Sequence, residues 1–152
     1  MKISRKILSV LAVTVCSISL LGIDSLAASS RIRGTLNYRV LDGSANNKFY
    51  TIGANKSIKI SGSVEKIGYN KNEVETNAYG QKVGVQTTYL NLYEKTLSGR
   101  GNKICSDSVK VSSGSKQFSA TGKSKNSNKK YMYIYKGMND GYDLSINGTI
   151  SY

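Results

Sequence analysis

Hydrophobic and polar residues alternate along most of this chain, and turn-forming residues interrupt the alternation at short intervals. The last stretch is the clearest case, because Tyr142, Leu144, Ile146 and Ile150 fall on one face of an extended strand and polar residues fall on the other. After residue 27, apolar residues at helical spacing never extend beyond a turn or two. Strands are therefore expected at residues 32–41, 48–52, 57–67, 82–96, 104–111, 116–121, 130–138 and 142–152.

The turns between these strands are rich in Gly, Asn, Asp and Ser, and no helical segment separates one strand from the next. Many short strands without crossover helices are typical of antiparallel sheets packed face to face. We therefore predict an all-β fold, a single antiparallel β-sandwich of the Ig-like or jelly-roll-like kind, over residues 28–152. That segment has the size of one ordinary domain.

Residues 1–27 have the layout of a secretory signal peptide, with a cationic start, an apolar run over residues 7–23 and the small residues of "SLAA" behind it. Cleavage is expected after Ala27, which predicts a secreted, extracellular protein that could associate with the cell wall. The alternative is an uncleaved anchor stopped by Arg31 and Arg33. The apolar run is short for a membrane span, and the small residues suit a peptidase better.

The stretch "KKYMYIYKG" places Tyr131, Tyr133 and Tyr135 on one face of a strand, with Met132 and Ile134 on the other. The face that lies inside decides whether the phenols fill the core or form a surface. Since "MNDGY" follows this stretch and is a strong hairpin signal, we expect it to pair with residues 142–152.

The length of that hairpin loop would set which face lies inside. With a loop of residues 140–141, Tyr135 would oppose Ile146 and the phenols would enter the core. With a loop of residues 139–141, closed by Gly141 in the left-handed conformation, Ile134 would oppose Ile146 instead, because a shift of one residue exchanges the faces. The longer loop buries the aliphatic residues and leaves the hydroxyls in reach of water, so we predict that the phenols point outward.

The stretch "TTYLNLYEKT" repeats the pattern, with leucines on one face and two further tyrosines on the other. If both strands share a sheet, the five phenols form one outward patch on which sugar rings could stack. The predicted ligand-binding residues are Tyr89, Tyr93, Tyr131, Tyr133 and Tyr135, bordered by Lys95, Lys129 and Lys130. The alternative is purely structural, since aromatic cross-strand pairs also stabilise sheet faces or pack beneath a second sheet.

Composition narrows the chemistry that the chain can perform. It has no histidine, which excludes imidazole-based triads and histidine metal sites. Of its few carboxylates, Glu73 and Glu75 share a polar loop and Asp140 falls in a turn, so we expect these three to be solvated at the surface. "NDGYD" lacks the acidic spacing of a calcium loop, and the glycines form no phosphate-binding pattern. We therefore expect no enzyme activity, metal or cofactor. Cys105 is the single cysteine after residue 27 and is expected to be a quiet core thiol, with pairing between chains as the alternative.

Charge gives the firmest indication of partners. The chain holds 22 basic and 9 acidic residues, and 19 and 8 of these remain after residue 27, for a net charge of about +11. Such an excess attracts anionic polymers in a salt-dependent way. For an exported protein these are anionic or carbohydrate polymers of the cell wall or matrix, or an anionic membrane surface, rather than nucleic acid. The alternative function is a cationic antimicrobial or toxin-like protein, and an oligomer is compatible with the sequence.

Overall fold

The computed structural model describes residues 28–152, so the predicted signal peptide lies outside the described residues. The described chain is built almost wholly from strands, with one short 3-10 helix after the third strand. The elements are β1 (Ser29–Leu36), β2 (Val40–Asp42), β3 (Ser57–Tyr69), η1 (Lys71–Glu73), β4 (Thr87–Thr96), β5 (Gly99–Lys110), β6 (Ser115–Lys123), β7 (Lys130–Lys136) and β8 (Tyr142–Ser151). Among the residues that the structure describes, no helix is long and apolar enough to cross a membrane.

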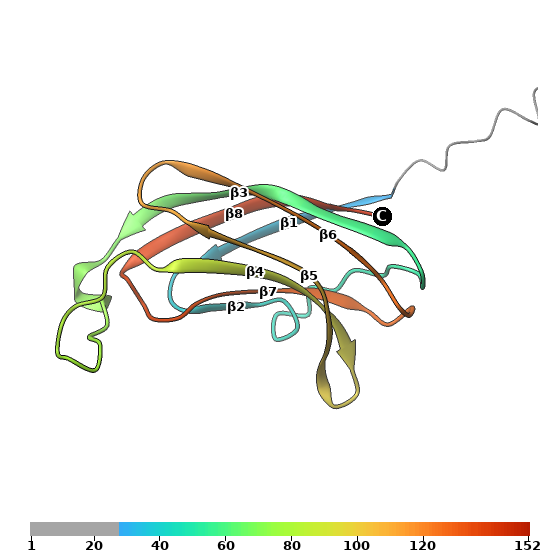
Figure 1. The fold of residues 1–152 in the computed structure, drawn as a ribbon, viewed down its shortest axis with the longest axis horizontal. Coiled ribbons are helices and arrows are strands. Elements are labelled where there is room, and N and C mark those ends of the chain that lie inside the picture. Colours follow the sequence, from blue (N-terminus) through green and yellow to red (C-terminus); the bar gives the residue numbers. More distant parts are fainter. Residues whose placement is uncertain (1–27) are drawn as a thin grey trace, which may run out of the picture.

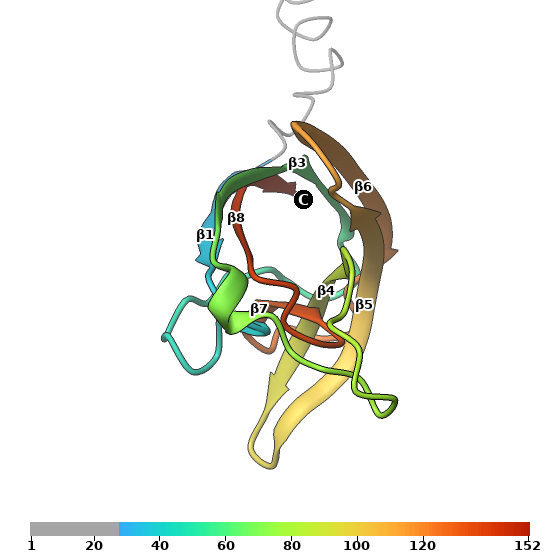
Figure 2. The same cartoon turned by 90° about the vertical axis from the view of Figure 1, so that its left-hand side faces the viewer.

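The strands form two four-stranded antiparallel sheets that face each other (Figure 1). One sheet has the order β1-β8-β3-β6 and the other the order β2-β7-β4-β5. Each of the first four strands therefore pairs with the strand at the mirror position in the chain, as in a long hairpin wound around a core. This is the eight-stranded jelly-roll arrangement, which the view along the strands shows as two curved sheets around a common interior (Figure 2). The predicted all-β sandwich is confirmed, in its jelly-roll form.

The core lies between the sheets and consists mainly of aliphatic side chains at alternate positions. The upper sheet in Figure 1 contributes residues such as Ile60, Val64 and Ile146, and the lower sheet contributes Leu90 and Leu92, all of which are fully buried. Each such side chain contributes about 1.5–3 kcal/mol by leaving water. Alternation at period two therefore accounts for the sandwich directly, because each sheet turns one hydrophobic face toward the other.

A pair of glycines makes room for the one large aromatic ring at the centre of the core. Gly62 and Gly148 are neighbours on β3 and β8, and a Cβ atom on either would lie 2.9–3.0 Å from Cζ of Phe118. The Phe118 side chain is 2% exposed. The absence of a side chain at these two positions thus allows the Phe118 ring to approach the sheet closely.

Several strand boundaries differ from those expected. Residues 32–41 split between β1 and β2, which belong to different sheets, and residues 48–52 form only an isolated bridge between Tyr50 and Lys130. The expected strand at residues 82–96 begins at Thr87, and the one at 104–111 begins earlier, at Gly99. Strand pairing in the β4–β5 hairpin therefore extends closer to the turn than the sequence pattern indicated.

The predicted hairpin between residues 130–138 and 142–152 is wrong. Strand β7 pairs with β2 and β4, whereas β8 pairs with β1 and β3 in the other sheet. Residues 139–141 instead carry the chain from one sheet to the other, and Gly141 does adopt the left-handed conformation, with φ of 76°. The predicted facing is nevertheless confirmed, since Met132 and Ile134 are buried in the core. Burial of the aliphatic side chains between the two sheets decides which face of β7 lies inside, and the register of the expected hairpin plays no part in it.

Candidate functional site

The five predicted tyrosines lie side by side on the outer face of the sheet β2-β7-β4-β5. Strands β4 and β7 are antiparallel neighbours, and their register pairs Tyr89 with Tyr135 and Tyr93 with Tyr131, with Tyr133 opposite Asn91. Because side chains alternate across a strand, all five rings leave the sheet on the same side. We call Tyr89, Tyr93, Tyr131, Tyr133 and Tyr135 the tyrosine strip.

Each ring of the tyrosine strip contacts a neighbouring ring along the sheet. Tyr89 and Tyr135 are stacked, with ring centroids 5.0 Å apart and planes inclined by 20°. Tyr135 in turn lies 5.6 Å from Tyr133, and Tyr93 is stacked on Tyr131 at 6.1 Å. Such pairs contribute about 0.5–1.5 kcal/mol beyond their burial. The strip is thus a preformed aromatic surface rather than five separate side chains.

Arg100 lies over the middle of the strip, a position that sequence reasoning missed. Its guanidinium carbon is 3.7 Å from the ring centroid of Tyr133 and 5.1 Å from that of Tyr93. A hydrogen bond with the Tyr133 side chain is the main cause that raises the pKa of Arg100 above its usual value. At this distance a cation–π contact contributes about 0.5–2 kcal/mol. Arg100 is therefore the charged group that lies over the centre of the tyrosine strip.

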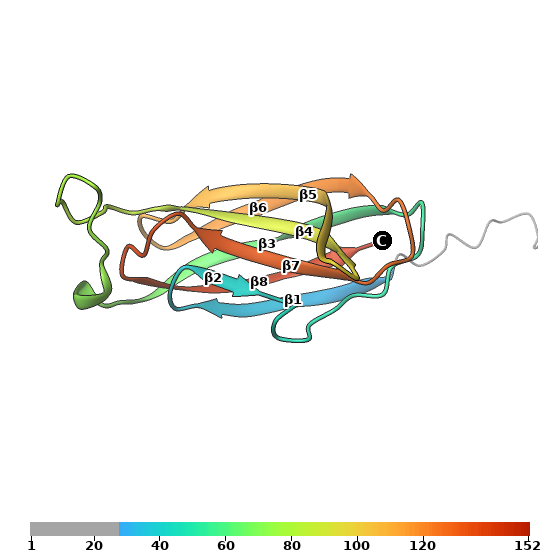
Figure 3. The same ribbon diagram turned by 90° about the horizontal axis from the view of Figure 1, so that it is seen from below.

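The β4–β5 hairpin carries Arg100 to this place. The pairing of β4 with β5 is irregular between Leu92 and Tyr93 and again between Tyr93 and Lys95, and Lys95 then pairs with Arg100. Such bulges bend a strand pair. The hairpin accordingly projects from the lower sheet in Figure 1, and in the view from below it rises over the face that bears the strip (Figure 3).

The members of the strip differ in exposure. Tyr89 is 40% exposed, and Tyr93, Tyr133 and Tyr135 are half-buried, but Tyr131 is only 2% exposed. Phe49, from the segment after β2, packs edge-on against Tyr131 with ring centroids 6.3 Å apart. Burial is the main cause that raises the pKa of the Tyr131 hydroxyl. Tyr131 is therefore a support for the strip and cannot itself present a surface to a ligand.

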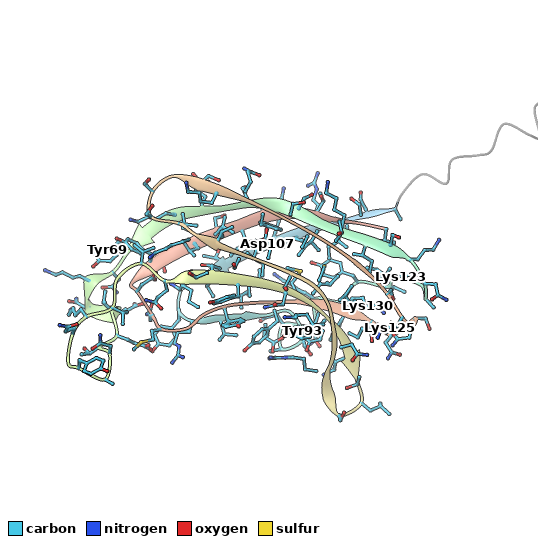
Figure 4. The ribbon with its side chains drawn as sticks, in the orientation of Figure 1. Tyr69, Tyr93, Asp107, Lys123, Lys125 and Lys130 are labelled. Atoms are coloured by element: carbon cyan, nitrogen blue, oxygen red, sulfur yellow. The ribbon has the colours of Figure 1, made fainter. Side chains whose placement is uncertain are left out.

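Lys130 does not border the strip, contrary to prediction. It points to the inner side of β7, where it is fully buried, whereas the strip lies on the outer side of the same sheet; Figure 4 labels Lys130 and Tyr93. Its Nζ lies 3.9 Å from Oε1 of Glu94, its cross-strand partner, and donates to the backbone carbonyls of Asn126 and Asn128. The alternation of β7 explains this placement, since residue 130 shares a face with Met132.

The other two predicted lysines remain near the strip. Lys129 is exposed, with its Nζ 5.5 Å from the ring centroid of Phe49, and Lys95 is half-buried beside Arg100 on the hairpin. Lys129 thus leaves a cationic group next to an aromatic ring, and Lys95 adds a second cation to the hairpin that carries Arg100. The structure thus brings together seven of the eight predicted residues, one of them covered, and separates Lys130 from them.

A hollow with a cavity volume of about 400 Å³ opens beside Tyr89 and Tyr135. The two stacked rings form one side of it, and polar side chains from β4 and β5 form the rest. Its lining residues are Tyr89, Asn91, Lys103, Ser106, Asp107, Ser108 and Tyr135. Sequence reasoning missed the contribution of β5, which became visible only from the pairing of Asn91 with Ser106 and of Tyr89 with Ser108.

Comparison with known proteins gives distant likenesses only. No protein-family model and no curated protein matches the sequence. A CBM4 carbohydrate-binding module is 8% identical over 85% of this chain and 86% of the module, with a TM-score of 0.45. The CBM22-1–GH10 modules of the Clostridium thermocellum endo-1,4-β-D-xylanase 10B, solved with xylohexaose, are 15% identical over 86% of this chain and 25% of that one, with a TM-score of 0.45. The C-terminal domain of the sugar-binding protein EclA is 10% identical over 86% of this chain and 82% of that one, with a TM-score of 0.39. Values this low carry no inference about a ligand.

The carboxylates near the site are engaged in structural contacts. Asp107, the one acidic residue that lines the hollow, accepts hydrogen bonds from the backbone N–H groups of Ser108 and Ser119, each at 2.7 Å. Glu94 is buried with Lys130, and Asp140 is buried with Lys136 rather than exposed in a turn as predicted. Within residues 28–152, no group of three or more acidic or cysteine side chains could hold a metal ion.

Cations around the strip have no acidic partners. The described residues form three ion pairs, which involve Arg39, Lys130 and Lys136. Arg100 and Lys103 are in none of them, and the two carboxylates on this face, Asp42 opposite Tyr133 and Asp107 in the hollow, accept backbone N–H groups instead. A ligand on this face would therefore meet aromatic rings, hydroxyl and amide groups, and uncompensated cations.

Proposed function

We propose that this protein is an exported, noncatalytic β-sandwich that binds carbohydrate or anionic polymers of the cell envelope or extracellular matrix through the tyrosine strip and its hollow. The observation that carries the proposal is the stacked pair Tyr89–Tyr135, which forms an aromatic wall beside a hollow lined with hydroxyl and amide groups. A sugar ring needs both kinds of surface, because its C–H face is apolar and its edge carries hydroxyls.

The hollow offers polar groups from β4 and β5 beside that wall. Ser106, Ser108 and the Asn91 amide come from strands that are already paired, so their backbone is fixed before a ligand arrives. Rings already stacked on each other lose little freedom when they bind. A few placed polar groups beside an apolar wall are the usual composition of a small-ligand site.

The arrangement of carboxylates supports binding without catalysis. Glycoside hydrolysis by the common mechanisms requires two carboxyl groups roughly 5–9.5 Å apart on either side of the scissile bond. Asp107 is the single acidic side chain that lines the hollow, and both of its oxygens accept backbone hydrogen bonds. A second carboxylate that could act with it does not line the hollow.

The net charge and the predicted export support a polymer of the cell envelope or matrix as the partner. A net charge of about +11 over residues 28–152 draws anionic polymers to the surface, and Arg100 and Lys103 place part of that charge beside the tyrosine strip and its hollow. Stacking on tyrosine then favours polymers that contain rings over those that contain only charge.

Affinity electrophoresis in gels that contain soluble polysaccharides, together with pull-down on purified cell-wall fractions, tests the proposal. Tyr89→Ala and Tyr135→Ala should each weaken retention by about tenfold, since each removes half of the aromatic wall. Tyr79→Ala is the matched control, because Tyr79 is 89% exposed on the loop before β4 and lies outside the strip. Thermal unfolding of each variant verifies that the fold is intact.

Retention that is absent for every polysaccharide, or that Tyr79→Ala reduces as much as Tyr89→Ala, would refute the proposal. Dye release from anionic vesicles at low protein concentration would point instead to the membrane-active alternative. Binding to such vesicles without release is compatible with the proposed function, because the cationic face would attract their headgroups.

A further inference from the structure

We propose that the ligand is an acidic polysaccharide whose sugar rings carry carboxylates, and that Arg100 is the residue that selects it. This inference rests on the proposed function, because it assigns the chemical class of the polymer that the tyrosine strip binds. It also gives a role to a residue that the alternation pattern did not indicate.

The geometry of Arg100 suits recognition of a carboxylate. Its guanidinium lies over Tyr133, 3.7 Å from the ring centroid, and also faces Tyr93. The guanidinium carries five N–H donors in one plane, and hydrogen bonds with the Tyr133 and Tyr131 side chains leave others of them free. These donors are arranged as a fork that matches the two oxygens of a carboxylate. Tyrosine contacts therefore hold the side chain in place and leave donors for a ligand.

The surroundings leave this charge for a partner outside the chain. Arg100 takes part in none of the three ion pairs formed among residues 28–152. Lys103 pairs with Tyr93 across the strands and also lines the hollow, and the Arg100 guanidinium carbon lies 5.1 Å from the ring centroid of the same tyrosine. A sugar ring against the wall formed by Tyr89 and Tyr135 would have Lys103 beside it in the hollow and Arg100 over the adjacent ring of Tyr133.

Carboxylates attached to sugar rings fit this arrangement better than phosphate polymers do. In a uronic acid the carboxylate is a substituent of the ring, so a ring that stacks on Tyr89 and Tyr135 carries its charge beyond the edge of that wall, toward Lys103 in the hollow and Arg100 over the neighbouring Tyr133. A polyphosphate chain has no ring to stack on Tyr89. Phosphate alone would therefore use the charge and leave the aromatic wall unused.

The test compares each acidic polysaccharide with its own neutral form. Polygalacturonate, alginate and hyaluronan would be used in native form and after reduction of their carboxyl groups, with polyphosphate as a polyanion without rings. Binding is measured in 150 mM NaCl, where the Debye length of about 8 Å limits attraction by distant charges. We expect the wild-type protein to bind at least one native polysaccharide tenfold or more tightly than its reduced form, and more tightly than polyphosphate.

Arg100→Gln should remove about tenfold or more of the affinity for that native polysaccharide, since a hydrogen-bonded charge pair is lost, and should change binding of the reduced form by less than about twofold. Arg33→Gln is the matched control, because it removes one exposed charge from β1 in the opposite sheet. It should leave the preference for the native form intact. Arg100→Lys should recover only part of it, because an ammonium lacks the planar fork.

Three results would overturn the inference. Equal binding of native and reduced forms throughout the panel, with Tyr89→Ala still abolishing binding, would leave the proposed function standing and remove the selection of acids. Equal losses in Arg100→Gln and Arg33→Gln, or binding of polyphosphate as tight as that of the polysaccharides, would reduce the effect to the general positive field. Retention that Tyr89→Ala does not change would refute the proposed function itself, and the inference with it.

Discussion

Removal of the Asp140 carboxylate should destabilise this protein more than most single substitutions. Lys136 Nζ lies 2.6 Å from Asp140 Oδ1, and the two side chains are 0% and 3% exposed. The same ammonium donates to the Tyr142 carbonyl at 2.8 Å, and the second carboxylate oxygen accepts from the backbone N–H of Gln86 at 2.7 Å. This pair holds the connection that carries the chain from β7 in one sheet to β8 in the other.

Asp140→Asn preserves shape but leaves the Lys136 ammonium buried without its counter-charge. Breaking a buried pair in this way costs about 3–5 kcal/mol, because the remaining charge keeps its desolvation penalty. For a domain of this size, a loss of that magnitude lowers Tm by roughly 10–20 °C. Asp143→Asn is the matched control, since Asp143 takes part in no ion pair among the described residues, and it should cost about 0.5 kcal/mol or less.

Urea unfolding of the single and double variants measures the pair directly. Lys136→Met placed in the Asp140→Asn background should recover part of the loss, because it removes the stranded charge, and the two substitutions should couple by about 1–3 kcal/mol. A cost below about 1 kcal/mol for Asp140→Asn, or strictly additive effects, would show that water reaches the pair and would refute the reasoning.

Three further predictions test other parts of the fold. Gly148→Ala should destabilise by about 1–3 kcal/mol in urea unfolding, because the new Cβ would lie 2.4 Å from the Ser61 carbonyl oxygen, and unchanged stability would show that the strands can separate. Cys105 should resist alkylation at pH 8 until the protein unfolds, since burial raises its pKa to about 11; rapid labelling of the folded protein would contradict this burial. The backbone N–H of Asn139 is the main cause that lowers the pKa of Glu75, so its contribution is full above the ordinary glutamate pKa and is lost as pH falls through the lowered value. Melting curves at pH 7 and pH 3 should therefore differ less for Glu75→Gln than for the wild type, and an equal difference would refute this.

The face of the strand on which each side chain of β7 lies was predictable from the sequence, because it depends only on local alternation. Met132 and Ile134 are buried and Tyr133 and Tyr135 lie on the outer face, as their spacing indicated. The assumed strand partner was wrong, yet the facing was right, since any sandwich that buries the aliphatic face gives the same result. Five tyrosines on two strands could likewise be expected on one surface as soon as β4 and β7 were placed in one sheet.

Strand partners were not predictable, because turn chemistry does not distinguish a hairpin from a connection between sheets. Residues 139–141 have the composition of a tight turn and contain a left-handed Gly141, but the chain crosses the sandwich there. Lys136 and Asp140 on either side of the crossing are buried together, an arrangement that the alternation pattern gives no sign of. Burial of a charged residue on the inner face of a strand can therefore be predicted only when its charged partner is known.

Arg100 and the hollow escaped prediction for a related reason. Their positions depend on the register of β5 against β4, which shifts at two irregularities before it reaches Arg100 opposite Lys95. Each irregularity changes which side chains share a face. Ser106 and Ser108 are unremarkable in sequence, and only the pairing with Asn91 and Tyr89 places them beside the aromatic wall.

The two buried lysines of β7 lie on the inner face of the sheet, and the tyrosine strip lies on its outer face. Lys130 and Lys136 stand at the two ends of the inner face, opposite Glu94 and Thr88 of β4, and each has a carboxylate partner. A slip of one residue in β7 would move both ammonium groups away from these carboxylates and turn the tyrosines into the core. The ion pairs thus penalise the wrong register at both ends of the strand.

A buried charge pair is a poor source of net stability, since packed hydrophobic residues would serve as well or better. Its value at β7 lies in the specification of register, because the aliphatic residues between the lysines are few and their shapes tolerate displacement. Register in turn decides whether Tyr135 meets Tyr89, the contact on which the aromatic wall depends. The tyrosine strip on the outside of the sheet is therefore positioned by charges on the inside, and substitutions at Glu94 should weaken the proposed retention of polysaccharides although Glu94 itself faces the core.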